Sequence, residues 1–173
     1  MFDNIRADIA AVRDRDPAAR SAIEIFFLYP GLKAVRMYRR AHWFYKHKCY
    51  FLARLISQRA VRKTGIEIHP GAKIGKGLFI DHGTGVVIGA TSIIGNHVKL
   101  YQGVTLGAKS FPLDAQGNPI KGIDRHPILE DNVIVYSNST ILGRITIGHD
   151  AIIGGNVWVT EDVAPNAKVL QRK

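Results

Sequence analysis

The sequence predicts an α+β protein in which an N-terminal α-helical segment (residues 1–64) precedes a left-handed parallel β-helix of hexapeptide repeats (residues 65–173) with one protruding loop. Two observations carry this prediction. Before Gly65, apolar residues recur at the spacing of amphipathic helices, and after it they recur every six residues. A long six-residue period is typical of a solenoid, because one short strand buries its aliphatic side chain only when neighbouring coils stack on it.

The segment before Gly65 predicts several helices separated by breaks. Helical spacing of apolar residues predicts a helix over Asp3–Arg13. Asp16 followed by Pro17 is a helix start signal, in which the carboxylate would be the N-cap. A break is expected at Tyr29-Pro30-Gly31, followed by helices over Leu32–Lys48 and Cys49–Thr64.

The six-residue register runs in two blocks on either side of one insertion. The positions expected to line the inner column are Ile68, Ile74, Ile80, Val86, Ser92, Val98 and Val104, then Val133, Ser139, Ile145, Ala151, Val157, Val163 and Val169. The corners of such coils need residues that are small or accept the left-handed conformation, which Gly, Asn and Asp supply. Between the blocks, Lys109–Arg125 contains two prolines and two glycines and is expected to leave the coil as a loop.

Composition and charge narrow the class of protein. The chain is 46% hydrophobic and 22% charged, which argues against disorder. Lys and Arg greatly outnumber Asp and Glu before Gly65, but no nucleic-acid motif accompanies them, so a solvated helical face is the favoured interpretation. One cysteine, no secretory leader and no stretch near the ~20 apolar residues of a membrane span predict a cytoplasmic protein without membrane or nucleic-acid partners.

Ionisable residues gather on either side of the inserted loop and in the helices. Glu67 and His82 are separated by slightly less than one coil, which takes roughly 18 residues, so they can lie close together on adjacent coils. A carboxylate beside an imidazole can orient the ring and stabilise the imidazolium, so this pair is a candidate for general base catalysis. The other candidate residues are Asp16, His42, Asp81, Arg125 and His126.

Four stretches of the chain carry motifs longer than a generic hexapeptide repeat. They are RDPAARSAIEIFFLYPGLKAVRMYRRAHW, TGIEIHPGAKIGKGLFIDHGTGVVIG, YQGVTLGAK and DRHPILEDNV. Together they resemble serine O-acetyltransferase, the enzyme that makes O-acetylserine for cysteine biosynthesis. The similarity runs from about Asp8 to about Val163, nearly the whole chain.

The resemblance implies a role for each candidate residue. His82 matches the general base that takes the proton of the serine hydroxyl, and Glu67 matches its acidic partner, which is often aspartate in the family. The positions that match amino-acid contacts in the family are Asp16, His42, Asp81, Arg125 and His126. The carboxylates suit the ammonium group of L-serine, and Arg125 suits its carboxylate through bidentate pairing.

The resemblance also implies the co-substrate and the assembly. Acetyl-CoA is expected along the outside of the coils between neighbouring subunits, held at positions that match Ala108, Ser137 and Gly155, and no metal is expected. A homotrimer is expected because such a site needs a neighbouring chain, and pairing of two trimers into a hexamer is left open. The tail that docks into cysteine synthase in many relatives is not seen after Val169, so no stable complex of that kind is expected.

Two departures from the family pattern bear on regulation and acceptor choice. Ala90 stands in the stretch VVIGAT, where the family usually has glutamate close to the substrate end of the site, so feedback inhibition by cysteine is left open. The loop Lys109–Arg125 is longer than the shortest family versions and could cover the site.

Three alternatives remain at this stage. The first is an acetyl-CoA-dependent transferase that acts on another acceptor, such as homoserine or a sugar, although Asp16, His42 and Arg125 favour a zwitterion. The second is a zinc hydratase on the same fold, which would need converging imidazole ligands; the only close histidine pair, His42 and His47, lies in the helical segment. The third is a non-catalytic scaffold.

Overall fold

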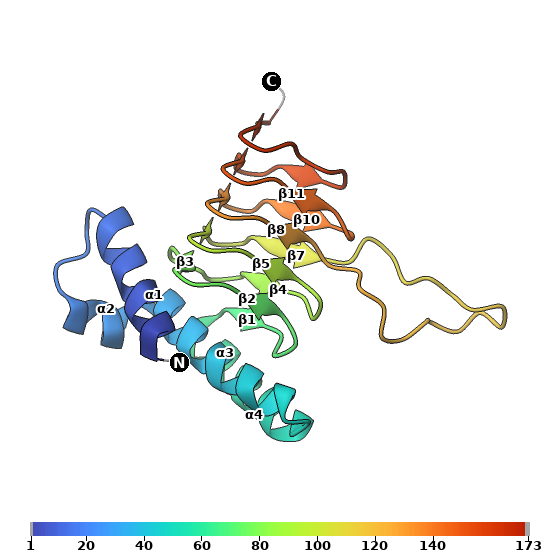
Figure 1. Ribbon diagram of the computed structural model, residues 1–173, viewed down its shortest axis with the longest axis horizontal. Helices are drawn as coiled ribbons and strands as arrows, with labels where there is room; N and C mark the ends of the chain where they lie inside the picture. The colour runs from blue at the N-terminus through green and yellow to red at the C-terminus, as the bar shows by residue number, and fades with distance from the viewer. Residues whose placement is uncertain (1, 172–173) are drawn as a thin grey trace.

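The computed structural model of the chain describes residues 2–171, in which four helices precede fourteen short strands (Figure 1). The helices are α1 (Phe2–Arg15), α2 (Ala22–Leu28), α3 (Pro30–Lys46) and α4 (Tyr50–Thr64). The first, third and fourth confirm the helices predicted there, with ends shifted by one or two residues. The predicted break at residues 29–31 is confined to Tyr29, because Pro30 occupies the first position of α3, where no N–H is needed. The predicted domain limits at residues 1 and 173 lie outside the described residues.

The predicted helix start at Asp16 is wrong. The chain turns there instead, and Asp16 Oδ1 accepts a hydrogen bond from the Ala18 N–H at 2.8 Å. Such a local turn competes with the helix for the same backbone groups. α2 begins only at Ala22, where the Ser21 hydroxyl accepts a hydrogen bond from the Glu24 N–H at 3.1 Å and forms the N-cap.

The coils form three parallel sheets of five, four and five strands, which confirms the predicted α+β fold of helices followed by a left-handed parallel β-helix. The first sheet holds β1 (Glu67–Ile68), β4 (Val87–Ile88), β7 (Thr105–Gly107), β10 (Thr140–Leu142) and β13 (Trp158–Val159); the second holds β2 (Lys73–Ile74), β5 (Ile93–Ile94), β8 (Ile128–Leu129) and β11 (Thr146–Ile147); the third holds β3 (Phe79–Ile80), β6 (Lys99–Leu100), β9 (Ile134–Val135), β12 (Ile152–Ile153) and β14 (Lys168–Val169). The inward side chains of all three sheets form one buried aliphatic core.

The first coil is longer than the next one, which corrects the predicted register. Ile68 pairs with Ile88, which in turn pairs with Leu106, so the first of these steps along the chain is the longer by two residues. The corner after β3, residues 81–86, has two residues more than the corner stacked on it, residues 101–104. Because of these two residues, Ile88 rather than Val86 continues the column of Ile68, although Val86 is also buried.

The inserted loop is the second departure from the repeat, and its prediction is confirmed. Ile94 pairs with Leu129 of the next coil, although the chain between them includes the whole of Lys109–Arg125. Figure 1 shows this segment leaving the coils after β7 and returning at β8. Residues 109–122 are exposed throughout.

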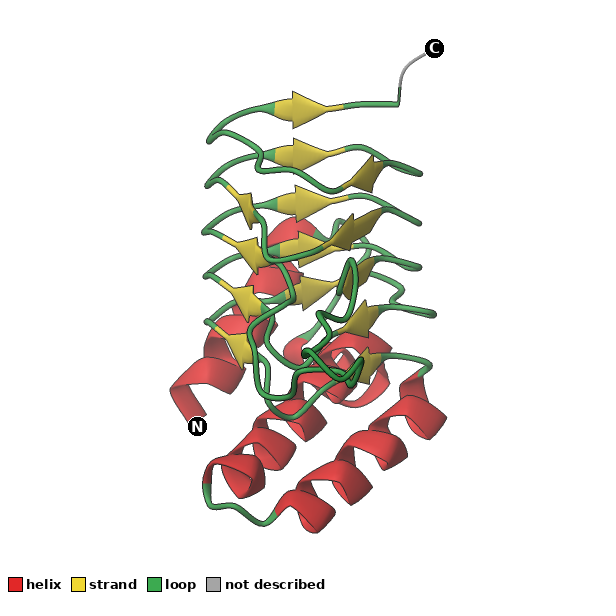
Figure 2. Cartoon of the chain, turned by 90° about the vertical axis from the view of Figure 1, so that its right-hand side faces the viewer, coloured by secondary structure: helices red, strands yellow, loops and turns green. Residues whose placement is uncertain are grey.

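The helices pack against the first coil and cover that end of the core (Figures 1 and 2). Val35 and Tyr38 of α3 belong to the aliphatic core, and the Tyr38 hydroxyl donates a hydrogen bond to the Ala72 carbonyl at 2.6 Å. α3 approaches β3 so closely that a Cβ at Gly31 would overlap the Ile80 carbonyl oxygen. A glycine inside this helix therefore permits close packing of helix on coil.

A buried ion pair attaches α1 to the rest of the chain. Arg39 of α3 donates from Nε and Nη2 to the two carboxylate oxygens of Asp8, both at 2.9 Å. Asp8 also accepts the Gly77 N–H at 2.9 Å, and Arg39 donates to the Gly75 carbonyl at 2.9 Å. These bonds fix α1 against the first coil and so determine where its C-terminal end lies.

Candidate active site

The corners between strands stack into three edges that run along the β-helix (Figure 2). We call them the His82 edge, the loop edge and the third edge. Strands of the first sheet run from the His82 edge to the loop edge, so these two edges lie on opposite sides of that sheet. The His82 edge comprises residues 81–86, 101–104, 136–139 and 154–157; the loop edge comprises residues 69–72, 89–92, 108–127 and 143–145; the third edge comprises residues 75–78, 95–98, 130–133 and 148–151.

His82 lies in the enlarged corner of the His82 edge. Its backbone is in the left-handed region, with φ of 57°, and its side chain is 77% exposed. Its Nε2 is 3.9 Å from Oδ1 of Asp81, which directly follows β3. An accessible imidazole beside a carboxylate is suited to accept and release a proton.

Lys99 of β6, next to this edge, is a residue that the sequence did not predict. Its Nζ lies 3.1 Å from Asp81 Oδ2 and 4.6 Å from the ring centroids of both Phe79 and Tyr101. Burial alone would lower the pKa of Lys99, but its contacts with Tyr101 and Asp81 outweigh burial and raise it, so the ammonium stays charged. The pairing of β3 with β6 sets Phe79 opposite Lys99, which is the signal that could have found it.

Asp16 directly follows α1. Its Oδ2 accepts a hydrogen bond from the Tyr29 hydroxyl at 2.9 Å. Burial, that hydrogen bond and the negative charges of Asp16, Glu24 and Asp81 raise the pKa of Tyr29 to about 12, so the hydroxyl remains protonated. Tyr29 therefore bonds to Asp16 and is also influenced by the charge of Asp81, which its place in the chain break did not reveal.

Glu67 lies at the start of β1, paired with Val87 of β4. Its Oε1 is 3.6 Å from Nη2 of Arg54 on α4. Within residues 2–171 no ion pair joins Glu67 to His82, and the carboxylate that His82 contacts is Asp81. The Glu67 backbone adjoins the corner that holds His82, because its N–H donates to the Val86 carbonyl at 2.8 Å, and the acid–base pair stays a prediction.

Arg125 and His126 lie at the loop edge, where the loop returns to the coil. His126 is buried, and burial, followed by the positive charge of Arg125, lowers its pKa. The Arg125 guanidinium lies over the Phe111 ring, 4.7 Å from its centroid. Its Nε is buried and has no hydrogen-bond partner among residues 2–171.

His42 lies apart from the site residues at the His82 edge and from Arg125 and His126, although it faces the start of the loop edge. Its Nδ1 is 2.8 Å from the Pro70 carbonyl oxygen. Together with Tyr38 and Trp43 it lines a cavity of about 370 Å³, and no other predicted site residue borders this cavity. The structure therefore gives His42 a packing environment rather than proximity to Asp16 or Arg125.

The predicted acetyl-CoA contacts divide between the same two edges. Ser137 and Gly155 lie on successive corners of the His82 edge, where a Cβ at Gly155 would meet the Ser137 carbonyl oxygen at 3.4 Å. Ala108 follows β7 at the loop edge. All three have small side chains or none, which leaves neighbouring backbone groups accessible.

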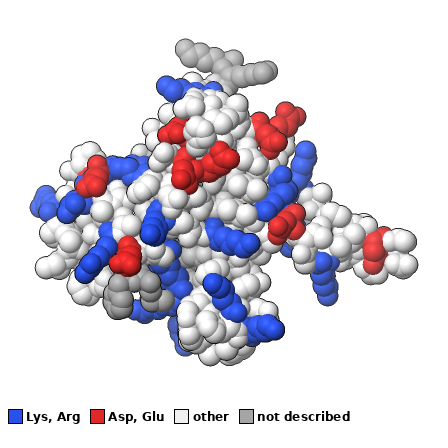
Figure 3. All heavy atoms as spheres, in the orientation of Figure 1, with Lys and Arg blue, Asp and Glu red and all other residues white. Residues whose placement is uncertain are grey.

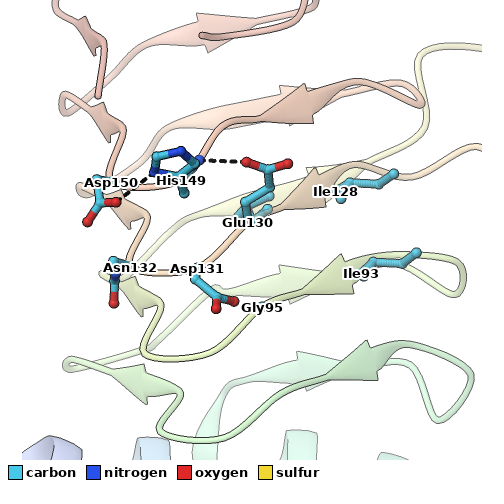
Figure 4. Close-up of a pocket in the computed structure, with 9 residues that line it drawn as sticks. Ile93, Gly95, Ile128, Glu130, Asp131, Asn132, His149 and Asp150 are labelled. Atoms are coloured by element: carbon cyan, nitrogen blue, oxygen red, sulfur yellow. Dashed lines mark hydrogen bonds and ion pairs between the residues drawn. The ribbon is translucent and has the colours of Figure 1, made fainter. Parts of the chain in front are cut away.

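The third edge holds polar residues that the sequence did not predict as functional. Figure 4 shows His149 there, with Nδ1 2.8 Å from Asp150 and its backbone N–H 2.8 Å from Glu130. These residues border an open hollow of about 580 Å³ that includes none of the predicted site residues. Among residues 2–171 no group of three or more His, Cys, Asp or Glu is placed to hold a metal ion.

Two surface features complete the description of the chain. In the face shown in Figure 3, Lys and Arg are scattered over the helices between uncharged residues, in keeping with a solvated surface. Across the described residues, every helix is too short or too polar to cross a membrane.

Comparison with known proteins identifies relatives of both segments. The family model for the N-terminal segment of serine acetyltransferase matches residues 1–37, and the model for six repeats of the bacterial transferase hexapeptide matches residues 126–161. The chain is 52% identical over 165 residues to the plasmid serine acetyltransferase of Synechococcus elongatus, covering 95% of this chain and 52% of that protein. It is 49% identical over 170 residues to serine acetyltransferase of Bacillus licheniformis, covering 98% of this chain and 74% of that protein.

A solved structure shows the same agreement in three dimensions. The serine acetyltransferase of Neisseria gonorrhoeae in complex with serine matches 99% of this chain and 66% of its own, with a TM-score of 0.90 at 34% identity. The chain spans about half the length of the Synechococcus relative and about three quarters of the Bacillus relative. Because identity and fold extend over helices and coils together, the chain belongs to the serine acetyltransferase family.

Proposed function

We propose that this chain transfers the acetyl group of acetyl-CoA to the hydroxyl of L-serine, giving O-acetylserine for cysteine biosynthesis in the cytoplasm. Membership of the family across helices and coils is the observation that carries the proposal. The Neisseria relative in complex with serine supports the choice of acceptor. The opposite charges at the His82 edge and the loop edge suit a zwitterion better than a sugar.

In the proposed reaction His82 is the general base. It takes the proton of the serine hydroxyl while that oxygen attacks the thioester carbonyl carbon. The new carbon–oxygen bond forms, the carbon–sulfur bond breaks, and the sulfur of coenzyme A leaves and regains a proton. The exposed position of His82 on the enlarged corner leaves its ring free to meet two substrates.

The two ends of the acceptor would be held by groups of opposite charge. Asp16 and Asp81 suit the ammonium group; Asp16 accepts the hydrogen bond of the Tyr29 hydroxyl, and the charge of Asp81 acts on the same hydroxyl. Arg125 and His126 suit the carboxylate, and the buried Arg125 Nε, which has no partner among residues 2–171, is a donor that a carboxylate would satisfy. Holding both ends would orient the hydroxyl towards His82.

These two groups lie on opposite sides of the first sheet, so one chain cannot present them to one molecule of serine. A cyclic homotrimer would solve this, because it places the His82 edge of one chain beside the loop edge of the next. Acetyl-CoA would lie in the same seam, between Ser137 and Gly155 of one chain and Ala108 of its neighbour. Glu67 remains the proposed partner of His82, and its carboxylate would have to turn from Arg54 to meet that ring. Whether two trimers pair into a hexamer is a separate question for light scattering.

A thiol-release assay with acetyl-CoA tests the proposed activity. L-serine is the expected acceptor, with homoserine and sugars much slower, and His82→Ala is expected to abolish the release. Comparable rates with a sugar, or release that survives His82→Ala, would contradict the proposal. The same assay with added cysteine measures whether Ala90 alters inhibition.

A further inference from the structure

Thr91 connects the coil to both predicted carboxylate-binding residues. It lies at the loop edge, in the corner after β4. Its hydroxyl oxygen accepts hydrogen bonds from the backbone N–H groups of Arg125 at 3.0 Å and His126 at 3.2 Å. The same oxygen lies 2.8 Å from Nδ1 of the His126 ring. One hydroxyl therefore contacts the backbone and the side chain of the loop's return.

These contacts determine which nitrogen of His126 carries the proton. The backbone N–H of Thr91 points at Nδ1 from 3.2 Å, and because an amide N–H can only donate, Nδ1 is the acceptor. With both lone pairs of the Thr91 hydroxyl taken by the two backbone N–H groups, its hydrogen is free to donate to Nδ1 as well. The neutral ring consequently carries its proton on Nε2 and presents that nitrogen as a donor.

Packing holds the same ring in place. His126 is 8% exposed. Its Cδ2 and Nε2 lie so close to Gly89 that a Cβ there would overlap them. Arg144 adds hydrogen bonds to the carbonyl oxygens of Thr91 at 2.8 Å and His126 at 3.1 Å. The ring has one orientation that satisfies these contacts, and within residues 2–171 its hydrogen bonds are with the hydroxyl and the backbone N–H of Thr91.

We propose that Thr91 is a positioning residue for acceptor binding, which holds His126 in its Nε2-protonated form and anchors the loop return that carries Arg125. Two donors, the His126 Nε2–H and the Arg125 guanidinium, are then available together for the acceptor carboxylate. That this acceptor is L-serine rests on the proposed function, whereas the locking of the ring follows from contacts within the chain.

Burial and most of the charges around His126 also favour its neutral form. Burial lowers its pKa most, and three positively charged or ionisable neighbours lower it further, whereas one carboxylate opposes them. These neighbours are Arg125, His69 and Arg144, opposed by Asp124. Hydrogen bonds donated to Nδ1 also favour the neutral ring, so loss of the Thr91 hydroxyl should make His126 easier to protonate.

Two substitutions at this position separate the hydroxyl from the shape of the side chain. Thr91→Val removes the hydroxyl and keeps the branched shape, and Thr91→Ser restores the hydroxyl. Thr146→Val on β11 is the matched control, because no hydrogen bond is made by its hydroxyl within residues 2–171. NMR titration of the His126 ring nitrogens follows protonation without any substrate, and steady-state kinetics give KM for L-serine and for acetyl-CoA separately.

In Thr91→Val we expect the His126 pKa to rise towards its ordinary value. KM for L-serine should rise roughly tenfold, the size expected for weakened hydrogen bonds to a charged group, while KM for acetyl-CoA and kcat change little. Thr91→Ser and Thr146→Val should resemble the unaltered chain in both measurements. An unchanged His126 titration in Thr91→Val, or a Thr91→Ser variant as impaired as Thr91→Val, would overturn the proposal. Failure of the unaltered chain to acetylate L-serine would overturn the proposed function alone, since the titration needs no substrate.

Discussion

The His82 edge and the loop edge both interrupt the six-residue repeat, but they do so in different ways. The His82 edge gains two residues, and its acidic groups are held by the coil and by the helices. The loop edge gains the whole segment Lys109–Arg125, and its cationic and imidazole groups depend on contacts at the loop's return, chiefly with Thr91. The third edge keeps the regular corner length and holds none of the predicted site residues.

This difference shows how a regular solenoid can acquire a site. Stacked coils supply rigidity, because aliphatic side chains fill most inward positions, with Ser92 and Ser139 buried among them. Corners of regular length repeat the same geometry and cannot converge on one small molecule. The two irregular corners provide groups of opposite charge on opposite sides of one sheet, and a neighbouring chain would bring them together.

The largest expected effect is on the rate of acetyl transfer, when His82 is compared with a histidine at a corner of regular length. His82→Ala should reduce acetyl transfer by about 100-fold or more, as expected for loss of a general base. His97→Ala is the matched control, because His97 is also exposed and also left-handed, with φ of 56°, but lies on the third edge. Initial rates and thermal unfolding of both variants give the comparison. Equal losses in the two variants would mean that the corner, and not the base, is required.

A smaller effect is expected from replacing Lys99, whose ammonium group is paired with Asp81. Lys99 and the acceptor ammonium would share one carboxylate and repel each other, so Lys99→Met should lower KM for L-serine roughly threefold, the size of one weak charge pair. Lys73→Met, at an exposed position of β2, should leave KM unchanged. A raised KM in Lys99→Met would show instead that Lys99 is needed to orient Asp81.

The smallest expected effect is the contribution of His126, at the loop edge, to the pH dependence of the free energy of unfolding. Because burial lowers the pKa of His126, the folded chain binds a proton there less readily than the unfolded chain, whose histidine titrates near 6.5. The stability contributed by the neutral ring is complete above that pH and is lost as the pH falls through the lower folded value. Denaturant unfolding at pH 7.5 and 5.0 should therefore show less acid destabilisation in His126→Gln than in the unaltered chain. The same change in the exposed control His97→Gln would contradict this assignment.

Much of the fold follows from the sequence, because the repeat reflects burial that every coil needs. The loop boundaries were predictable from prolines and glycines, and the strands on either side pair across the whole loop. The two-residue slip at residues 81–86 was missed because Val86 is aliphatic and continues the six-residue count past Ile80. Asp16 is not an N-cap because a carboxylate before proline also suits a turn, and the next helix begins only at Ala22.

Motifs located the site residues one by one but not their partners. Lys99, Tyr29 and Thr91 carry no motif of their own, since their roles come from pairing across coils or from helix packing. The contact of Glu67 with Arg54 of α4 likewise comes from helix packing and carries no motif.

The most direct test of a site shared between chains is complementation of two inactive variants. His82→Ala and Arg125→Ala chains carrying different affinity tags are co-expressed, and oligomers that bear both tags are purified and assayed at low L-serine concentration. In a cyclic trimer, every mixed oligomer has one seam with an intact His82 from one chain and an intact Arg125 from the next. We predict about one third of the activity of the unaltered trimer, against almost none for either variant alone. Mixed oligomers no more active than the parent variants would contradict a site built from two edges.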